Sequence, residues 1–134
     1  MITKNSATAD AQTTIQELKK LVESFVVDRE WQDFHNPKNL AMNISIEAAE
    51  LMELLLWEST SEITHVVEQK RELIQKELAD IFIAIVAFAN SCDIDIASTV
   101  IKKIDEIEKR YPVEIVKGKH NAKELVGHKK NTQQ

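Results

Sequence analysis

The stretch SIEAAELMELLLW, residues 45–57, has the leucine content of a helix that should be buried, yet it carries three glutamates. At about 100° per residue, Leu51 and Leu54 fall within about 40° of Glu47 on a helical projection. Glu50 falls about 60° from Glu47 on the same side. Two carboxylates are therefore expected on the apolar face of this helix.

A second stretch, RELIQKELADIFIAIVAFAN, repeats the arrangement with Glu77 and Asp80. These acids also stand three residues apart, and apolar side chains flank Glu77 within about 40°: Leu73, Ile81, Ala84 and Phe88. If the two helices pack together, four carboxylates converge: Glu47, Glu50, Glu77 and Asp80. Like charges that lose water repel one another, so a positive partner is required.

The composition of the site favours a metal ion as that partner. The apolar stripes carry no Lys or Arg beside the acids. Four carboxylates without Cys or His form an all-oxygen site, which suits Mg²⁺, or Mn²⁺, and suits zinc poorly. A ferritin-like di-iron centre would need Glu-x-x-His, which neither acid pair provides. Magnesium-dependent phosphate chemistry is the leading hypothesis, and solvated surface acids are the ordinary alternative.

Length and composition limit the fold. The chain has 134 residues, enough for one domain, and only 2 Gly and 2 Pro, which favours long helices over an all-β fold. A net charge of −5 argues against a dedicated nucleic-acid binder. Cys92 is the single cysteine, and the polar N-terminus and short apolar runs predict a cytoplasmic protein with no membrane span.

The apolar periodicity predicts an all-α four-helix bundle. The helices are expected near residues 14–28, 37–57 and 63–90, with a break near EQKRE as an option, and from SCDID to Pro112. Thr14 and Asn36 are the expected caps of the first two helices, and Asp93 or Asp95 that of the last. We expect a flexible N-terminus at 1–13, a helical domain at 14–112 and an extended C-terminal arm at 113–134, disordered at its end.

These motifs resemble the all-α MazG-like nucleoside triphosphate pyrophosphohydrolases. EAAE followed by ELAD is similar to their E-x-x-E, spacer, E-x-x-D signature, and REWQDFHNPKNL, LLLW, KKID and KRYPVE resemble the dCTP pyrophosphatase branch. The similarity covers roughly residues 25–119. It implies a helical bundle that assembles as a dimer or tetramer, and hydrolysis of a (deoxy)nucleoside triphosphate to the monophosphate and pyrophosphate.

The resemblance also implies roles for individual residues. The four acids would hold Mg²⁺, with Glu47 or Glu50 as the general base. The base and sugar pocket would contain Trp31, His35, Asn39 and Trp57, and the phosphates would be reached by Lys103, Tyr111 and Lys117. The family often has Asn where this chain has Ile107, which weakens the assignment of Lys103 and Tyr111.

Other readings remain open. A tryptophan at a helix end is more often a cover over the core than a stacking platform. A non-catalytic helical interaction or regulatory module with a structural metal site is the main alternative function, and a redox metalloprotein is a third. IFIAIVAFA is apolar on every side, which predicts a homo-oligomer in which Phe82, Ile83 and Val86 pack against a second copy.

Overall fold

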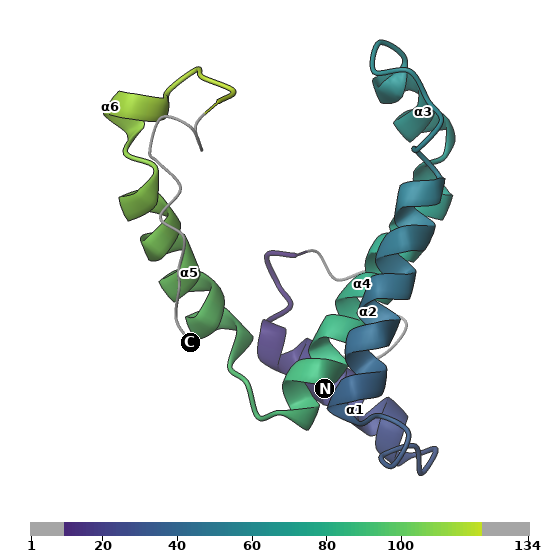
Figure 1. Cartoon of the computed structure of the whole chain (residues 1–134). Helices are drawn as coiled ribbons and strands as arrows, with labels where there is room; N and C mark the ends of the chain where they lie inside the picture. The colour runs from purple at the N-terminus through teal and green to yellow at the C-terminus, as the bar shows by residue number, and fades with distance from the viewer. Residues whose placement is uncertain (1–9, 122–134) are drawn as a thin grey trace. The chain divides into compact units, whose positions relative to one another are not determined.

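The computed structural model describes residues 10–121, and within that range the chain is helical, with no β-strand (Figure 1). The all-α prediction is therefore confirmed. The helices are α1 (Ile15–Val27), α2 (Pro37–Glu53), α3 (Ile63–Gln69), α4 (Arg71–Ser91), α5 (Ile96–Arg110) and α6 (Val113–Val116).

The expected caps begin three of these helices. Thr14 Oγ1 accepts from the backbone N–H of Glu17 at 3.2 Å, and Glu17 accepts in return from the Thr14 N–H at 2.8 Å, which completes a capping box. Asn36 precedes α2 and accepts from the N–H of Asn39 at 3.0 Å. Of the two aspartates proposed for the last long helix, Asp95 is the cap. Each cap satisfies a backbone N–H that the helix leaves without a partner.

Helix boundaries differ from expectation in two places. The second helix ends at Glu53 and continues as turns through Trp57, so the prediction of a helix to residue 57 was wrong by one turn. The segment predicted as an extended arm contains α6 at its start. The optional break is present at Lys70, between α3 and α4. Residues 1–9 and the proposed disordered end of the arm lie outside the described residues.

The chain divides into two compact units, the first ending at Ile94 and the second beginning at Asp95. The predicted domain at 14–112 includes parts of both. In the first unit α4 is central and packs against α1, α2 and α3 (Figure 1). The first helix is tied to the end of α4, where Lys19 Nζ donates to the Ile94 carbonyl at 2.8 Å and Asn90 donates to the Lys19 carbonyl at 2.9 Å.

The core of the first unit is small. From residue 10 onward its buried apolar residues are Val26, Leu40, Val66, Ala84, Val86, Ala87 and Ala89, of which four belong to α4. Val86 has no exposed surface within the single chain, so the expectation that it packs against a second copy was wrong. Phe82 and Ile83 are 37% and 48% exposed, so their apolar surface is still open to a partner.

The second unit, described to residue 121, consists of α5 and α6. The apolar residues of α5 at positions 100, 101, 104 and 107 are 43–62% exposed. A stripe of this kind is normally covered in a folded protein or in an assembly. Within residues 10–121 no single helix is both long enough and apolar enough to cross a membrane.

Candidate functional site

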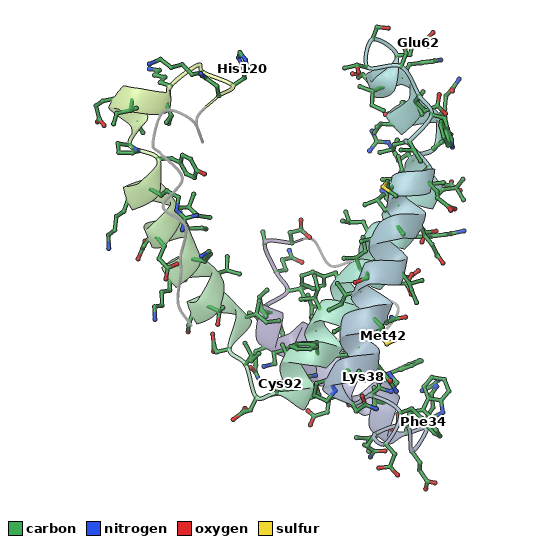
Figure 2. All side chains as sticks on the ribbon, viewed as in Figure 1. Phe34, Lys38, Met42, Glu62, Cys92 and His120 are labelled. Atoms are coloured by element: carbon green, nitrogen blue, oxygen red, sulfur yellow. The ribbon has the colours of Figure 1, made fainter. Side chains whose placement is uncertain are left out.

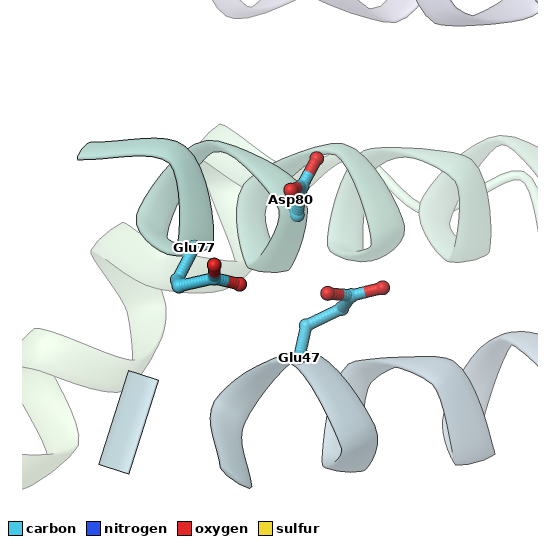
Figure 3. Close-up of side chains that lie close together, drawn as sticks. All are labelled: Glu47, Glu77 and Asp80. Carbon is cyan, nitrogen blue, oxygen red and sulfur yellow. The ribbon is translucent and has the colours of Figure 1, made fainter. Parts of the chain in front are cut away.

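The acids of the two motifs meet where α2 packs against α4. Figure 3 shows Glu47 reaching from α2 toward Glu77 and Asp80 of α4. One carboxylate oxygen of each lies within 4.8 Å of the others. Glu47 and Glu77 are half-buried and Asp80 is exposed, so the cluster lies at the edge of the interface rather than deep in the core. The expected convergence is therefore present for three of the four acids.

The fourth acid, Glu50, acts on the same group. The pKa of Glu77 is raised above its ordinary value of 4.5, first because partial burial removes water from the carboxylate. The negative charges of Glu50 and Asp80 raise this pKa further, together with a side-chain hydrogen bond between Glu50 and Glu77 and the charge of Glu47. The carboxylates of Glu47, Glu50 and Asp80 thus oppose the ionisation of Glu77.

No basic side chain relieves this repulsion among the described residues. The ion pairs there join Lys70 to Glu58, Arg71 to Glu68 and Lys103 to Glu106, and none includes an acid of the cluster. A set of carboxylate oxygens with uncompensated negative charge matches what hard divalent cations bind. The residues present therefore fit a divalent cation of the Mg²⁺ or Mn²⁺ type.

Three of the expected pocket residues lie close together before α2 and in its first turn. The rings of Trp31 and His35 stack at 6.1 Å, and Trp31 meets Phe25 edge-on at 5.8 Å. His35 Nδ1 lies 2.9 Å from the Trp31 carbonyl, which can only accept, so Nε2 is the acceptor in the neutral ring. The Asn39 amide donates to the Phe34 carbonyl at 3.1 Å. Trp31, His35 and Asn39 therefore share one short, internally bonded segment.

Trp57 lies at the other end of α2. The 17 residues of this helix span about 25 Å at 1.5 Å per residue. Figure 2 shows Phe34 and Glu62, which flank the two ends, far apart along the α2–α4 pair. Trp57 is 88% exposed, and it is not a cover over the core of this chain. Within one chain, the four residues expected around the base and sugar are thus divided between two places.

A cavity of about 380 Å³ lies beside the His35 segment. Its lining comes from α1, the segment before α2 and the end of α4, and includes His35 but neither Trp31 nor Asn39. Gln32, Asn90 and Ser91 supply polar groups to it. No motif in the sequence marks these three residues, because only the folded chain brings them together.

The residues expected at the phosphates belong to the second unit. Lys103 forms an ion pair with Glu106 at 3.0 Å. Tyr111 follows the last residue of α5 and is half-buried, and Lys117 follows α6 and is exposed. Ile107, at the position where Asn is frequent, is 43% exposed. These residues are described within their own unit, and their roles remain predictions.

Comparisons with known proteins agree with the signature of the two acid pairs. Residues 42–125 match the MazG-like family. The chain is 36% identical over 109 residues to dCTP pyrophosphatase 1 of Rattus norvegicus and 32% identical over 108 residues to dCTP pyrophosphatase 1 of Homo sapiens. These matches cover 80% and 79% of this chain but only 64% of each relative, so the chain spans less than two thirds of their length.

A solved structure is also similar. It is a crystal structure of a pyrophosphatase from Archaeoglobus fulgidus DSM 4304, with a TM-score of 0.71 and 32% sequence identity. The match covers 78% of this chain and 98% of that chain.

Proposed function

Because the chain belongs to the MazG-like family, we propose that it hydrolyses deoxynucleoside triphosphates to the monophosphate and pyrophosphate in a Mg²⁺-dependent reaction. The proposed substrate is dCTP or a dCTP-like or modified nucleotide, since the curated relatives are dCTP pyrophosphatases. The proposed role is removal of surplus or modified nucleotides from the cytoplasmic pool.

The observation that carries this proposal is the group formed by Glu47, Glu77 and Asp80, whose oxygens lie within 4.8 Å of one another. These three side chains would hold the cation. When bound, a divalent cation neutralises phosphate charge and activates water for attack at the α-phosphorus.

Glu50, the remaining acid, is the proposed general base. Glu50 is exposed and stands outside the group of three closest carboxylates, although its charge acts on Glu77. Of the two candidates for the general base, Glu50 is therefore the one that is not a ligand in this scheme, and its carboxylate would accept the proton of the attacking water. Glu47 would then serve as a ligand only.

The nucleobase end of the site is proposed to involve two copies of the chain. A nucleobase cannot touch both Trp57 and Trp31 of one chain, since α2, which is about 25 Å long, lies between them. An antiparallel arrangement of two α2 helices, as a two-fold axis would produce, could bring Trp57 of one copy to the Trp31 segment of the other. The exposed apolar side chains Phe82 and Ile83 favour such an assembly.

The test is pyrophosphate release from a panel of the four common dNTPs, 5-modified dCTP and CTP, with Mg²⁺ and with EDTA. We expect Mg²⁺-dependent release that is greatest with a cytosine nucleotide. For substitutions of the cluster acids, Glu68→Gln is the matched control. Glu68 is an acid of the same unit, and it pairs with Arg71 outside the cluster. Absence of pyrophosphate release from every nucleotide by the folded, Mg²⁺-supplied protein would refute the proposal and favour the non-catalytic helical module.

A further inference from the structure

Lys70 joins the two ends of the turn that carries Trp57. Its Nζ donates to the Leu54 carbonyl at 2.7 Å and to Glu58 Oε1 at 2.8 Å. Leu54 is the residue after α2, and Glu58 immediately follows Trp57. The Lys70 and Glu58 side chains are 33% and 32% exposed, so the bridge is partly shielded from water.

The position of Lys70 in the chain makes this bridge unexpected from local rules. Lys70 lies between α3 and α4 and directly precedes the N-terminus of α4. A cation there is unfavourable because the N-terminus of a helix is the positive end of its dipole. The ammonium instead reaches the C-terminal end of α2, where the last carbonyls lack partners inside the helix and attract a cation. The ammonium therefore points away from the N-terminus of α4 and binds a carbonyl 16 residues earlier in the chain.

The turn has little else to fix the indole. Backbone bonds within it join Leu56 to Met52 at 2.9 Å and Glu58 to Leu55 at 3.1 Å. The Trp57 side chain is 88% exposed, and among residues 10–121 no aromatic ring or cation stacks on it. Its direction therefore depends on the backbone of the 54–58 turn, and Lys70 holds the Leu54 carbonyl at one end of this turn and the Glu58 side chain at the other.

We propose that Lys70 is a positioning residue, which fixes the 54–58 turn so that the Trp57 indole is presented to the nucleobase. The proposal rests on the proposed function, in which Trp57 stacks on the base. Lys70 touches neither substrate nor metal in this scheme, and it acts through Trp57 alone. Its effect should therefore appear in substrate binding and disappear when Trp57 is absent.

The experiment combines a conformational measurement with kinetics. Lys70→Met removes the ammonium and keeps the length of the side chain, and Lys70→Arg retains a cation that can reach both acceptors. Arg71→Met is the matched control, because Arg71 is the next residue and its ion pair with Glu68 does not involve the turn. Each change is made in the Trp31→Phe protein, where fluorescence anisotropy of the metal-free enzyme reports Trp57 alone. KM and kcat for the best dNTP are measured for the same changes with Trp31 intact.

We expect Lys70→Met to increase the mobility of Trp57 and to raise KM about fivefold or more, the lower end of what stacking of one base contributes, with kcat nearly unchanged. Lys70→Arg should restore both values and Arg71→Met should leave both unchanged. In the Trp57→Ala protein, Lys70→Met should change KM by less than about twofold, because the two changes remove the same contribution. Glu58→Gln removes the charged acceptor and leaves the Leu54 carbonyl. It should give the same pattern at smaller amplitude, and it replaces Lys70→Met in the test if that variant fails to fold.

The outcomes separate this proposal from the proposed function. Unchanged anisotropy in Lys70→Met would overturn the idea that Lys70 fixes the turn, whatever the kinetics show. Increased mobility with an unchanged KM would overturn its role in presenting Trp57 to substrate. An equal rise in KM with and without Trp57 would also overturn it, since Lys70 would then act through general stability. If wild-type protein hydrolyses no nucleotide, the proposed function and the positioning role both fail, while the anisotropy still reports whether Lys70 holds the turn.

Discussion

Trp57→Ala should weaken substrate binding strongly while leaving the fold intact. The indole is 88% exposed in the described chain, so its removal opens no cavity within the protomer. Substitutions at such positions usually change the free energy of unfolding by no more than about 0.5 kcal/mol. The substitution should therefore leave the protein folded, and a loss of activity can be assigned to the site or to assembly.

The size of the effect follows from the stacking role. Alanine substitution of an aromatic residue under a base costs about 1–3 kcal/mol, which corresponds to roughly a 5- to 150-fold rise in KM. In the proposed role the indole would contact the base and not the reacting phosphorus. It would then stabilise ground state and transition state alike, and kcat should change by less than about twofold.

The assay is steady-state pyrophosphate release over a range of concentrations of the best dNTP, with light scattering to check that assembly is unchanged. Leu56→Ala is the control, because it removes an apolar side chain that is 50% exposed from the same turn. An unchanged KM in Trp57→Ala would refute the stacking role. A KM raised equally in Leu56→Ala would show that the turn, and not the indole, is responsible.

Three further predictions concern the acid cluster and the assembly. Glu47→Gln and Asp80→Asn should each reduce turnover to near background without unfolding the protein, and wild-type turnover in either would contradict the metal assignment. Because the raised pKa of Glu77 makes its ionised form unfavourable in the folded chain, the free energy of unfolding of the metal-free protein should fall as pH rises from 4.5 through that pKa. Glu77→Gln should flatten this fall in circular-dichroism melts with EDTA, and an unaltered pH profile would exclude Glu77 as its source. Light scattering at micromolar concentration should show a dimer or tetramer, with Phe82→Lys shifting it toward the monomer, whereas a wild-type species of 15.3 kDa would contradict the assembly.

Much of the helical layout could be predicted from the sequence because its signals are local. The capping box of Thr14 and Glu17 and the Asn36 cap act over three residues, so they are readable without knowing the fold. The i, i+3 spacing of Glu47 with Glu50, and of the acids on α4, likewise follows from helix geometry alone. The sequence by itself therefore determined which faces carry carboxylates.

Only the tertiary structure decided how these faces are used. The packing of α2 on α4 brings Glu47 within 4.8 Å of Glu77 and Asp80 and leaves Glu50 as a neighbour of Glu77. The folded chain also buries Val86 completely, although the sequence pattern made it equivalent to its exposed neighbours on an all-apolar helix.

The end of α2 shows the physical reason most clearly. The apolar periodicity predicted a helix as far as Trp57, because leucines continue the pattern to that point. The helix ends at Glu53. The ammonium of Lys70, 16 residues further along the chain, donates a hydrogen bond to the Leu54 carbonyl. Helix propensity depends on residues that are neighbours in sequence. The contact between Lys70 and Leu54 forms only when the chain folds back after α3 and brings Lys70 to the end of α2. The direction of Trp57 is therefore a property of the folded chain.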